Sequence, residues 1–292
     1  MTPDRGRAPN DWSLSCAAVR GKSRGGGVTL RAEEIEPGVV RLAFSSWRGR
    51  TVGYEVSTYL IDGVLVDTGF PIVADELFAA AATRSPRGVI VTHWHEDHAG
   101  NAARLAELGI PIRMHPLCEA ALRERPTIRF YRQFVWGRSP RLAAPLRDFD
   151  PTPLQVIAAP GHTEDHVVVW DAARGIVASG DLYLGVKVRV AHPHESPGAL
   201  LRSLRMVMAL EPRLLLDAHR GVVRNPVPML AAKIAWMEET IGAITELASS
   251  GCGEREIQRR VLGRESFVGW VSRGEYSKRS FVRSVLRDRT HD

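Results

Sequence analysis

Three histidines and one aspartate stand close together in the run Thr-His-Trp-His-Glu-Asp-His at positions 92–98. Side chains of an extended backbone alternate with a period of two, so His93 and His95 can point the same way. Asp97 and His98 come after the chain turns and can point to a second position nearby. Imidazoles and carboxylates suit zinc, iron and manganese. Such a cluster rarely arises by accident, so the run predicts a metal site.

Three further candidate ligands follow downstream, each at the end of a strand-like segment. They are His162 in Pro-Gly-His-Thr, Asp181 in Ser-Gly-Asp, and His219 in Asp-Ala-His-Arg-Gly. Each one alone is typical of a turn or a solvated loop. Beside the cluster at 92–98 they become candidate metal ligands, because side chains from several loops can converge on one point. One cluster can bind one ion, and seven converging ligands can bind two.

These motifs resemble those of the metallo-β-lactamase superfamily, with the glyoxalase II-like hydrolases as the branch indicated. The matching positions are His93-x-His95-x-Asp97-His98, Asp67 in Asp-Thr-Gly, Pro160-Gly161-His162-Thr163, Asp181 and His219. The similarity covers roughly residues 35–222. It implies an α+β fold, the αββα sandwich of that family, in which two sheets pack face to face with helices outside. A C-terminal helical extension is expected to follow the sandwich.

The resemblance also implies a dinuclear centre with two divalent metal ions. One ion would be bound by His93, His95 and His162, and the other by Asp97, His98 and His219. Asp181 would bridge them. Zinc is the expected metal, with iron and manganese as alternatives in a mixed site. Two such ions lower the pKa of a shared water. Asp97 is assigned the catalytic role of orienting this nucleophile. Asp67 and His166 are expected to support the ligands from behind.

The order of elements fits this architecture. Strands are expected at 39–44, 89–91, 154–159, 167–170, 176–179 and 214–216, and helices at 74–83, 100–108 and 197–210. Two strand-like runs joined by Asp62-Gly63 predict a hairpin with a type I′ turn. Apolar residues at helical spacing predict a long helix after residue 226 and a last helix near 276–288. The predicted divisions are a flexible lead (1–27), a catalytic domain (28–225) and a helical region (226–292).

The overall composition is that of an ordinary globular protein. The chain has 292 residues, of which 44% are hydrophobic and 25% charged, with a net charge of +6. It has no apolar run of the roughly 18 residues that a membrane helix needs, and its first residues lack a secretory pattern. A cytoplasmic protein without a membrane contact is therefore expected. Cys16, Cys118 and Cys252 form no CxxC pair, so they predict neither a disulfide framework nor a thiolate metal site.

The substrate is less well determined by the sequence than the site is. An ester, thioester or lactone of a small molecule is the leading interpretation. Tyr183, Tyr131, Phe134 and Trp136 are candidate substrate contacts, and the segment 116–150 is a candidate lid. The C-terminal helices are expected to cover the metal cleft or to form a homodimer. His192 and His194 are interpreted as loop residues.

Two other functions are kept open. The segment 113–147 carries eight arginines and two glutamates, and arginine binds phosphate well. That favours either a phosphodiesterase or nuclease of the same fold, or an anionic small substrate. The remainder of the body is acidic, so nucleic acid is not the expected partner. A metal-bound signalling protein without turnover is the third alternative.

Overall fold

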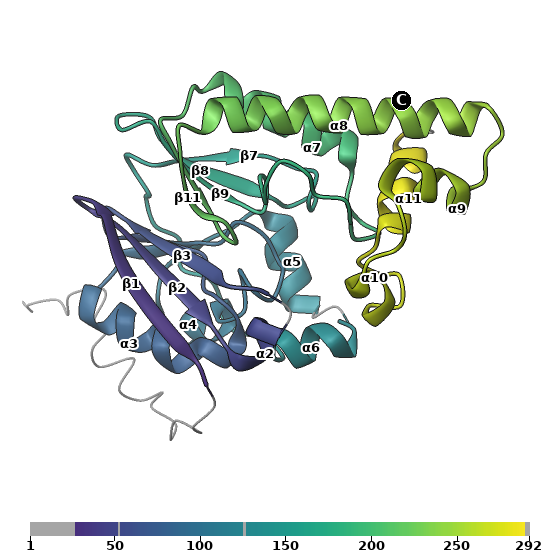
Figure 1. The fold of residues 1–292 in the computed structure, drawn as a ribbon. Helices are drawn as coiled ribbons and strands as arrows, with labels where there is room; N and C mark the ends of the chain where they lie inside the picture. Colours follow the sequence, from purple (N-terminus) through teal and green to yellow (C-terminus); the bar gives the residue numbers. More distant parts are fainter. Residues whose placement is uncertain (1–26, 52, 125–126, 290–292) are drawn as a thin grey trace, which may run out of the picture.

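The computed structural model describes residues 27–51, 53–124 and 127–289. Its strands form two sheets (Figure 1), one of six strands and one of five. The first sheet contains β1 (Thr29–Glu36), β2 (Val39–Ser45), β3 (Val56–Ile61), β4 (Val64–Val66), β5 (Gly88–Ile90) and β6 (Ile112–Arg113). The second contains, in spatial order, β11 (Gly221–Arg224), β10 (Leu214–Asp217), β9 (Ile176–Gly180), β8 (Val167–Asp171) and β7 (Gln155–Ala158).

The first sheet is antiparallel from β1 to β4 and parallel from β4 to β6. The predicted hairpin at its centre is present. β3 and β4 pair through Ile61 and Val64, and both turn residues have a positive φ, 45° at Asp62 and 76° at Gly63. A type I′ turn requires this conformation at both central positions. The hairpin thus brings β4 back beside β3 and sends its carboxyl end toward Asp67.

Four layers stack to form the body of the protein. The two sheets face each other across one apolar core, which includes Tyr59 and Ile90 from the first sheet and Val169 and Leu216 from the second. The outer face of the first sheet packs on α3 (Ala74–Arg84), α4 (Ala102–Glu107) and α5 (Pro116–Glu124). The outer face of the second packs on α7 (Pro197–Ala209) and α8 (Pro226–Ser249). The predicted αββα sandwich is confirmed.

A group of short helices follows α8 and packs on its far end (Figure 1). It comprises α9 (Glu254–Ile257), a π-helical turn (Gln258–Leu262), α10 (Phe267–Val271) and α11 (Lys278–Asp288). Ile257, Phe281, Val282 and Val285 bury their side chains against Ile244 of α8. The chain returns toward the sandwich after α10, where Ser277 pairs with Ala191 in an isolated β-bridge. The C-terminal helices therefore contact the body as well as α8.

Some elements differ from the sequence-based expectation. β1 was not predicted, because most of its side chains are exposed and it lies at the edge of its sheet. The segment 116–150, for which no helix was predicted, contains α5 and α6 (Phe130–Trp136). A further short helix, α2 (Trp47–Thr51), precedes β3. The predicted flexible lead falls almost wholly on residues 1–26, which lie outside the described residues together with Cys16. The domain limits at 28–225 and 226–292 stay predictions.

None of the helices in the described part of the chain combines the length and the apolar character that crossing a membrane requires. Both described cysteines, Cys118 and Cys252, are free thiols.

Candidate metal centre

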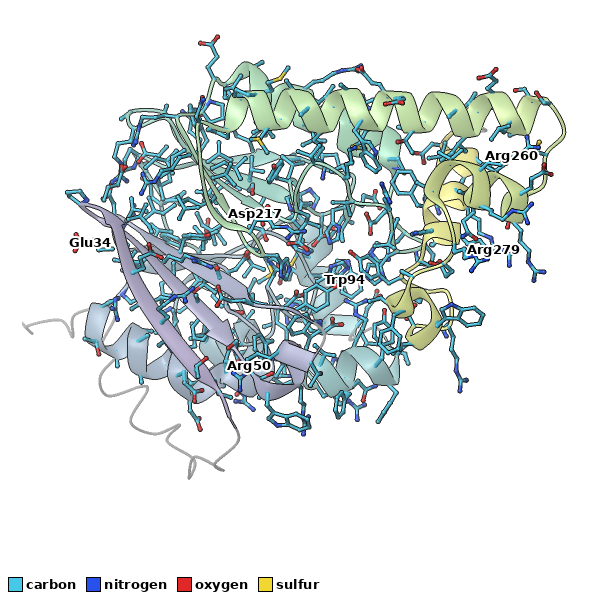
Figure 2. The ribbon with its side chains drawn as sticks, viewed as in Figure 1. Glu34, Arg50, Trp94, Asp217, Arg260 and Arg279 are labelled. Atoms are coloured by element: carbon cyan, nitrogen blue, oxygen red, sulfur yellow. The ribbon has the colours of Figure 1, made fainter. Side chains whose placement is uncertain are left out.

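The predicted ligands converge where the ends of strands from both sheets meet. His93, His95, Asp97 and His98 lie on the loop after β5, and His162 lies on the turn before β8. Asp181 directly follows β9, and His219 follows β10. Figure 2 labels Trp94, on the loop after β5, and Asp217, the last residue of β10, in the middle of the view. Loops held by rigid strands are a common location for functional side chains.

The seven side chains form two groups of potential metal-binding atoms. His93, His95, His162 and Asp181 make up the first, and Asp97, His98 and His219 the second. The ligand atoms within each group lie within 4.8 Å of one another. The structure therefore brings all seven predicted positions together, in groups that match the two ligand sets expected from the sequence.

The Asp181 carboxylate lies between these two groups. Its Oδ2 atom is 3.3 Å from His162 Nε2 in the first group. Its Oδ1 atom is 3.2 Å from His98 Nε2 and 3.4 Å from His219 Nε2 in the second. One oxygen thus faces each group, which is the arrangement that a bridging carboxylate needs. Asp97 joins the second group through an Oδ2 atom 3.2 Å from His219 Nε2.

Several polar atoms that face the centre of this cluster have no hydrogen-bond partner among the described residues. They are His93 Nε2, His98 Nε2 and Asp181 Oδ1, all buried. A buried polar atom without a partner costs about 1–3 kcal/mol, so several in one place require an explanation. Imidazole nitrogens and a carboxylate oxygen are suitable donors for divalent metal ions. The orphaned atoms fit metal binding at this place.

The electrostatics of the cluster favour added positive charge. Burial alone would raise the pKa of the Asp181 carboxyl, but the neighbouring His98 and His219 hold it well below its usual value. Burial would likewise lower the pKa values of His98 and His219, and the Asp181 carboxylate instead raises both well above the ordinary value. Burial lowers the pKa of His93. The acidic groups therefore attract cations, and metal binding at such a site displaces protons.

One nitrogen of each ligand histidine is anchored to a group outside the cluster. His93 Nδ1 is 3.1 Å from the Thr92 hydroxyl, and His98 Nδ1 is 2.8 Å from Asp67 Oδ2. The Asp67 carboxylate also accepts hydrogen bonds from the amide and hydroxyl of Thr92. Such contacts fix the tautomer and the orientation of a metal-binding histidine. They leave Nε2 of both rings directed at the centre.

The remaining three histidines are held in the same manner. His219 Nδ1 is 3.1 Å from the carbonyl oxygen of Glu55. His162 Nδ1 is 3.6 Å from Glu195 Oε2, and His95 Nε2 is 3.1 Å from His194 Nε2. Glu195 and His194 were not identified from the sequence as supporting groups. His194 was interpreted only as a loop residue, because nothing in the sequence indicates which distant loop folds over His95.

His166 supports the site through the backbone. Its Nε2 accepts a hydrogen bond from the Asp181 amide at 3.1 Å, and burial lowers the pKa of this ring to about 3, so the ring is neutral. Gly180 permits this contact, because it has a φ of 49° and a Cβ there would lie 2.7 Å from His166 Nε2. The predicted supporting position of His166 thus corresponds to a defined contact with the residue that carries the bridging carboxylate.

The predicted substrate contacts occupy different environments. The Trp136 ring is 6.5 Å from the His219 ring, and Tyr131 has a buried hydroxyl without a partner among the described residues. Phe134 instead packs on the exposed Trp47 ring, away from the ligands. Tyr183 lies in the apolar core that the second sheet shares with α7 and α8. Trp136 is thus the nearest of these to a candidate ligand by a ring contact, and all four stay predictions as substrate contacts.

Two tyrosines that were not predicted lie near the centre. The Tyr54 ring is 5.8 Å from the His219 ring. The Tyr276 ring stacks on His192 at 4.5 Å, and the His192 ring is in turn 5.4 Å from His95. Burial raises the pKa values of both tyrosines, so both phenols stay protonated at neutral pH. Tyr276 belongs to the segment between α10 and α11, so the C-terminal region contributes to the walls of the site.

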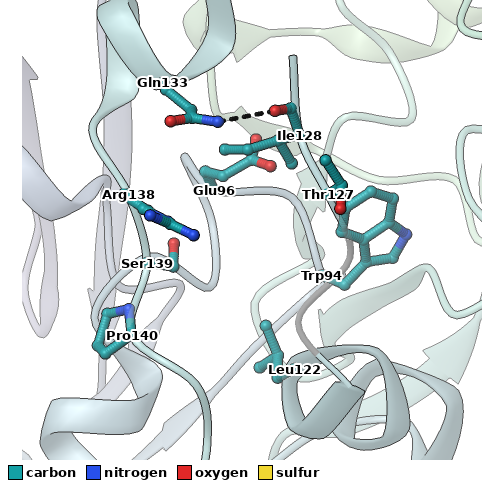
Figure 3. A pocket seen from close by; sticks show the side chains of 9 residues that line it. All are labelled: Trp94, Glu96, Leu122, Thr127, Ile128, Gln133, Arg138, Ser139 and Pro140. Atoms are coloured by element: carbon teal, nitrogen blue, oxygen red, sulfur yellow. Dashed lines mark hydrogen bonds between the residues drawn. The ribbon is translucent and has the colours of Figure 1, made fainter. Parts of the chain in front are cut away.

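A buried ion pair fixes α6 against the histidine loop. Arg132 donates two hydrogen bonds to Glu96 Oε2, at 3.0 and 2.6 Å, and its guanidinium lies over the Trp94 ring. Trp94 and Glu96 are the residues between the ligands in the run 92–98. They also line a hollow, together with Gln133 and Arg138 (Figure 3). None of the seven candidate ligands lines this hollow, so it is separate from the metal centre.

Lys233 of α8 lies on the opposite side of the centre and is 2% exposed. Its ammonium donates a hydrogen bond to the Tyr183 carbonyl. It lines a small cavity with His162, Asp181 and Glu195. Burial lowers the pKa of Lys233 to about 8. No carboxylate in the described residues forms an ion pair with it, so this lysine is a candidate source of pH-dependent stability.

Replacement of Lys233 by methionine is expected to change how the free energy of unfolding depends on pH. The folded protein loses the Lys233 proton near pH 8, whereas an unfolded chain keeps it to about pH 10.4. The unfolded state therefore binds more protons between these values, and stability rises with pH. Relative to Lys233→Met, the wild type should gain up to about 3 kcal/mol from pH 7.5 to 10.5. Urea unfolding at several pH values measures this, and a constant difference would contradict it.

Comparisons with known proteins point to one family. A family model described as the metallo-beta-lactamase superfamily matches residues 51–219. A lactamase-like protein of Pestalotiopsis fici is 24% identical over 89% of this chain and 82% of its own. An atrochrysone carboxyl ACP thioesterase of Paecilomyces divaricatus is 28% identical over 66% of this chain and 59% of its own. The chain thus spans about six-tenths of the length of that thioesterase.

The fold is also shared with solved structures. A metallo-beta-lactamase family protein of Thermus thermophilus superposes with a TM-score of 0.57 at 18% identity. The match covers 90% of this chain and 94% of the other. At this identity the likeness establishes the fold alone.

Proposed function

Because the chain belongs to the metallo-β-lactamase superfamily, we propose that it is a dinuclear metal-dependent hydrolase of small-molecule thioesters, carboxylic esters or lactones. The prediction of a metal-dependent hydrolase is supported by the family and by the thioesterases among its relatives. The observation that carries the dinuclear proposal is the position of Asp181, with one carboxylate oxygen facing each ligand group. Membership in the glyoxalase II-like branch stays a prediction.

The residues that would hold the metals follow from the two groups. His93, His95 and His162 would bind one divalent ion, and Asp97, His98 and His219 the other. Two ions held there would make hydroxide available at neutral pH and would polarise a substrate carbonyl. The mixed His/Asp ligand set favours zinc and also accommodates iron or manganese. Asp67, Glu195 and His194 would keep the imidazoles in place by the contacts described above.

The chain's own residues also orient the reacting groups. The Asp97 carboxylate lies at the centre, with Oδ2 facing His219. It can therefore accept a hydrogen bond from the attacking nucleophile. Tyr54 is a protonated phenol beside His219 and can donate to a substrate oxygen. Trp136 lies against Tyr54 at 5.7 Å and shields this side from solvent. The result is a site that excludes water on one side and stabilises developing negative charge.

Thioesters are the preferred substrate class in this proposal. Support comes from the relatives that are named carboxyl ACP thioesterases. In the reaction the acyl carbon–sulfur bond breaks and a carbon–oxygen bond to water forms. The products are a carboxylic acid and a thiol, which takes up a proton. Esters and lactones undergo the same addition with an oxygen leaving group.

A nuclease receives less support from the structure than from the sequence. The arginines of the segment 113–147 are largely engaged within the chain. Ion pairs join Arg113 to Asp148, Arg123 to Glu119, Arg129 to Glu275, and Arg132 to Glu96, and Arg141 and Arg147 donate hydrogen bonds to backbone carbonyls. Among the described arginines of that segment, Arg138 alone has neither kind of partner. A surface arranged to bind a phosphate backbone would keep more of these charges free.

The cytoplasmic location and the homodimer stay predictions.

A substrate panel tests the proposed function. Protein purified without a histidine tag is assayed with a thioester, a lactone, an aryl ester and bis-p-nitrophenyl phosphate. Thioester or lactone turnover that a chelator removes and added zinc restores is the expected result. The His95→Ala variant, which lacks a ligand, should be inactive. Turnover of the phosphodiester alone would place the protein among nucleases or phosphodiesterases, and turnover of no substrate at full metal loading would favour a non-catalytic role.

A further inference from the structure

Three aromatic side chains on α6 and α10 are largely exposed. Phe130 at the start of α6 is 80% exposed, and Phe267 and Trp270 on α10 are 76% and 75% exposed. Figure 1 shows α10 next to α6, and an ion pair of 3.0 Å between Arg129, just before α6, and Glu275, just after α10, joins the two segments. A single exposed apolar residue is ordinary, but several large ones on neighbouring segments indicate an interaction site. We refer to Phe130, Phe267 and Trp270 as the aromatic patch.

Positive charge that is not neutralised flanks this patch. Arg264 precedes α10 and Arg273 follows it, and both are exposed. Neither side chain has an ion-pair or hydrogen-bond partner in the part of the chain that the structure describes. The nearby acids are already engaged, because Glu265 accepts hydrogen bonds from backbone amides and Glu275 pairs with Arg129. The surface around α10 therefore offers free guanidinium groups to an acidic partner.

The aromatic patch lies close to the site along the chain. Tyr276 follows Trp270 by six residues, and its ring stacks on His192 next to His95. Six residues span at most about 20 Å. Glu275 also lies 3.8 Å from Arg132, which holds the histidine loop through Glu96. A partner bound at the aromatic patch would thus sit beside an outer wall of the metal centre.

We propose that the aromatic patch, with Arg264 and Arg273, docks an acidic carrier protein that presents the substrate thioester on a flexible arm. This inference rests on the thioester hydrolysis proposed above. Aromatic and arginine side chains commonly dominate the binding energy of interfaces, and an acidic carrier complements the free arginines. A second copy of this chain fits less well, because a twofold contact would bring the same arginines against one another. An anionic membrane would match the charge but would deliver no thioester.

Two substrates with the same acyl group test the proposal. One is an octanoyl group on the phosphopantetheine arm of an acidic acyl carrier protein, and the other is S-octanoyl-N-acetylcysteamine, which has no carrier. Wild-type metal-loaded protein should prefer the carrier-bound thioester by at least about tenfold in kcat/KM, which equals about 1.4 kcal/mol. This preference should fall as NaCl is added, because salt screens exposed charges. Equal kcat/KM values for the two substrates would overturn the proposal.

Variants of the docking surface give the second readout. Trp270→Ala and the double charge reversal Arg264→Glu/Arg273→Glu should each lower kcat/KM for the carrier-bound thioester at least about tenfold. Both should leave kcat/KM for the small thioester within about twofold. Met229→Ala, an exposed apolar residue of α8, and Arg224→Glu, an exposed residue of β11, are the matched controls. Equal losses with both substrates, or equal losses in the controls, would overturn the proposal.

Further measurements separate the other occupants of the surface. If the protein is a dimer by light scattering and Trp270→Ala makes it monomeric, the surface is a contact between copies. If it sediments with phosphatidylglycerol vesicles and Trp270→Ala prevents this, the surface binds membranes. If either result is found and kcat/KM is equal for the two thioesters, the carrier protein is rejected as the partner of this surface. Calorimetric binding of the carrier with a free thiol arm measures docking without turnover. If neither thioester is hydrolysed, the proposed function is wrong, but the calorimetric measurement still shows whether the carrier binds.

Discussion

Asp181→Asn is expected to lower kcat/KM for the thioester by at least about 10³-fold, or about 4 kcal/mol in activation free energy. The reason is the position of this carboxylate, which has one oxygen on His162 and the other on His98 and His219. Asparagine keeps the shape of the side chain but removes the negative charge between the two groups. The metal content measured by elemental analysis should also fall below that of the wild type.

Asp171→Asn is the matched control for this experiment. Asp171 is also a buried aspartate of the second sheet, but it lies at the far end of β8 and pairs with Arg174. Its variant should keep the metal content and most of the activity. The bridging role of Asp181 is refuted if Asp181→Asn retains both properties, or if Asp171→Asn loses them to the same degree.

Arg132→Met should lower the free energy of unfolding by about 3–5 kcal/mol, the usual cost of removing one partner of a buried ion pair. Both side chains of the Arg132–Glu96 pair are buried, with 6% and 5% exposed. Without Arg132, the Glu96 carboxylate has no compensating charge, and burial already raises its pKa. Urea unfolding followed by circular dichroism measures the change. Catalytic activity should fall as well, because Glu96 lies between two ligands.

Two further variants separate this effect from the loss of any arginine. Arg113→Met removes an exposed pair with Asp148 and should cost no more than about 1 kcal/mol. The double variant Arg132→Met/Glu96→Gln removes both buried charges and should recover part of the lost stability. A loss below about 1 kcal/mol for Arg132→Met, or no recovery in the double variant, would show that the pair does not hold α6 on the histidine loop.

The ligand positions were predictable because each one follows a recognisable strand or turn. His93–His98 come after the buried run that forms β5, and Asp181 comes directly after β9. A β-branched run that ends at a cluster of metal-binding side chains is a local pattern, and the order of the motifs along the chain adds to it. Most strands of the two sheets were predictable for the same reason, since they alternate or are apolar throughout, whereas β1, β6 and β11 were not predicted.

The groups that surround the ligands were not predictable, because they come from distant segments without a local signal. His194 reaches His95 and Glu195 reaches His162 from the loop before α7. Tyr276 reaches the site only because the C-terminal helices turn back onto the body. Phe134 and Tyr183 stay predictions as substrate contacts, since an aromatic residue near a motif has no feature in the sequence that separates a site wall from a core position.

The most direct test of the central claim is anomalous X-ray diffraction at the zinc edge, from crystals of protein loaded with zinc. The account predicts two zinc peaks separated by about 3.5–4 Å, with the Asp181 carboxylate between them. One peak should lie among His93, His95 and His162, and the other among Asp97, His98 and His219. A single peak, or none, in crystals grown at saturating zinc would contradict the dinuclear centre.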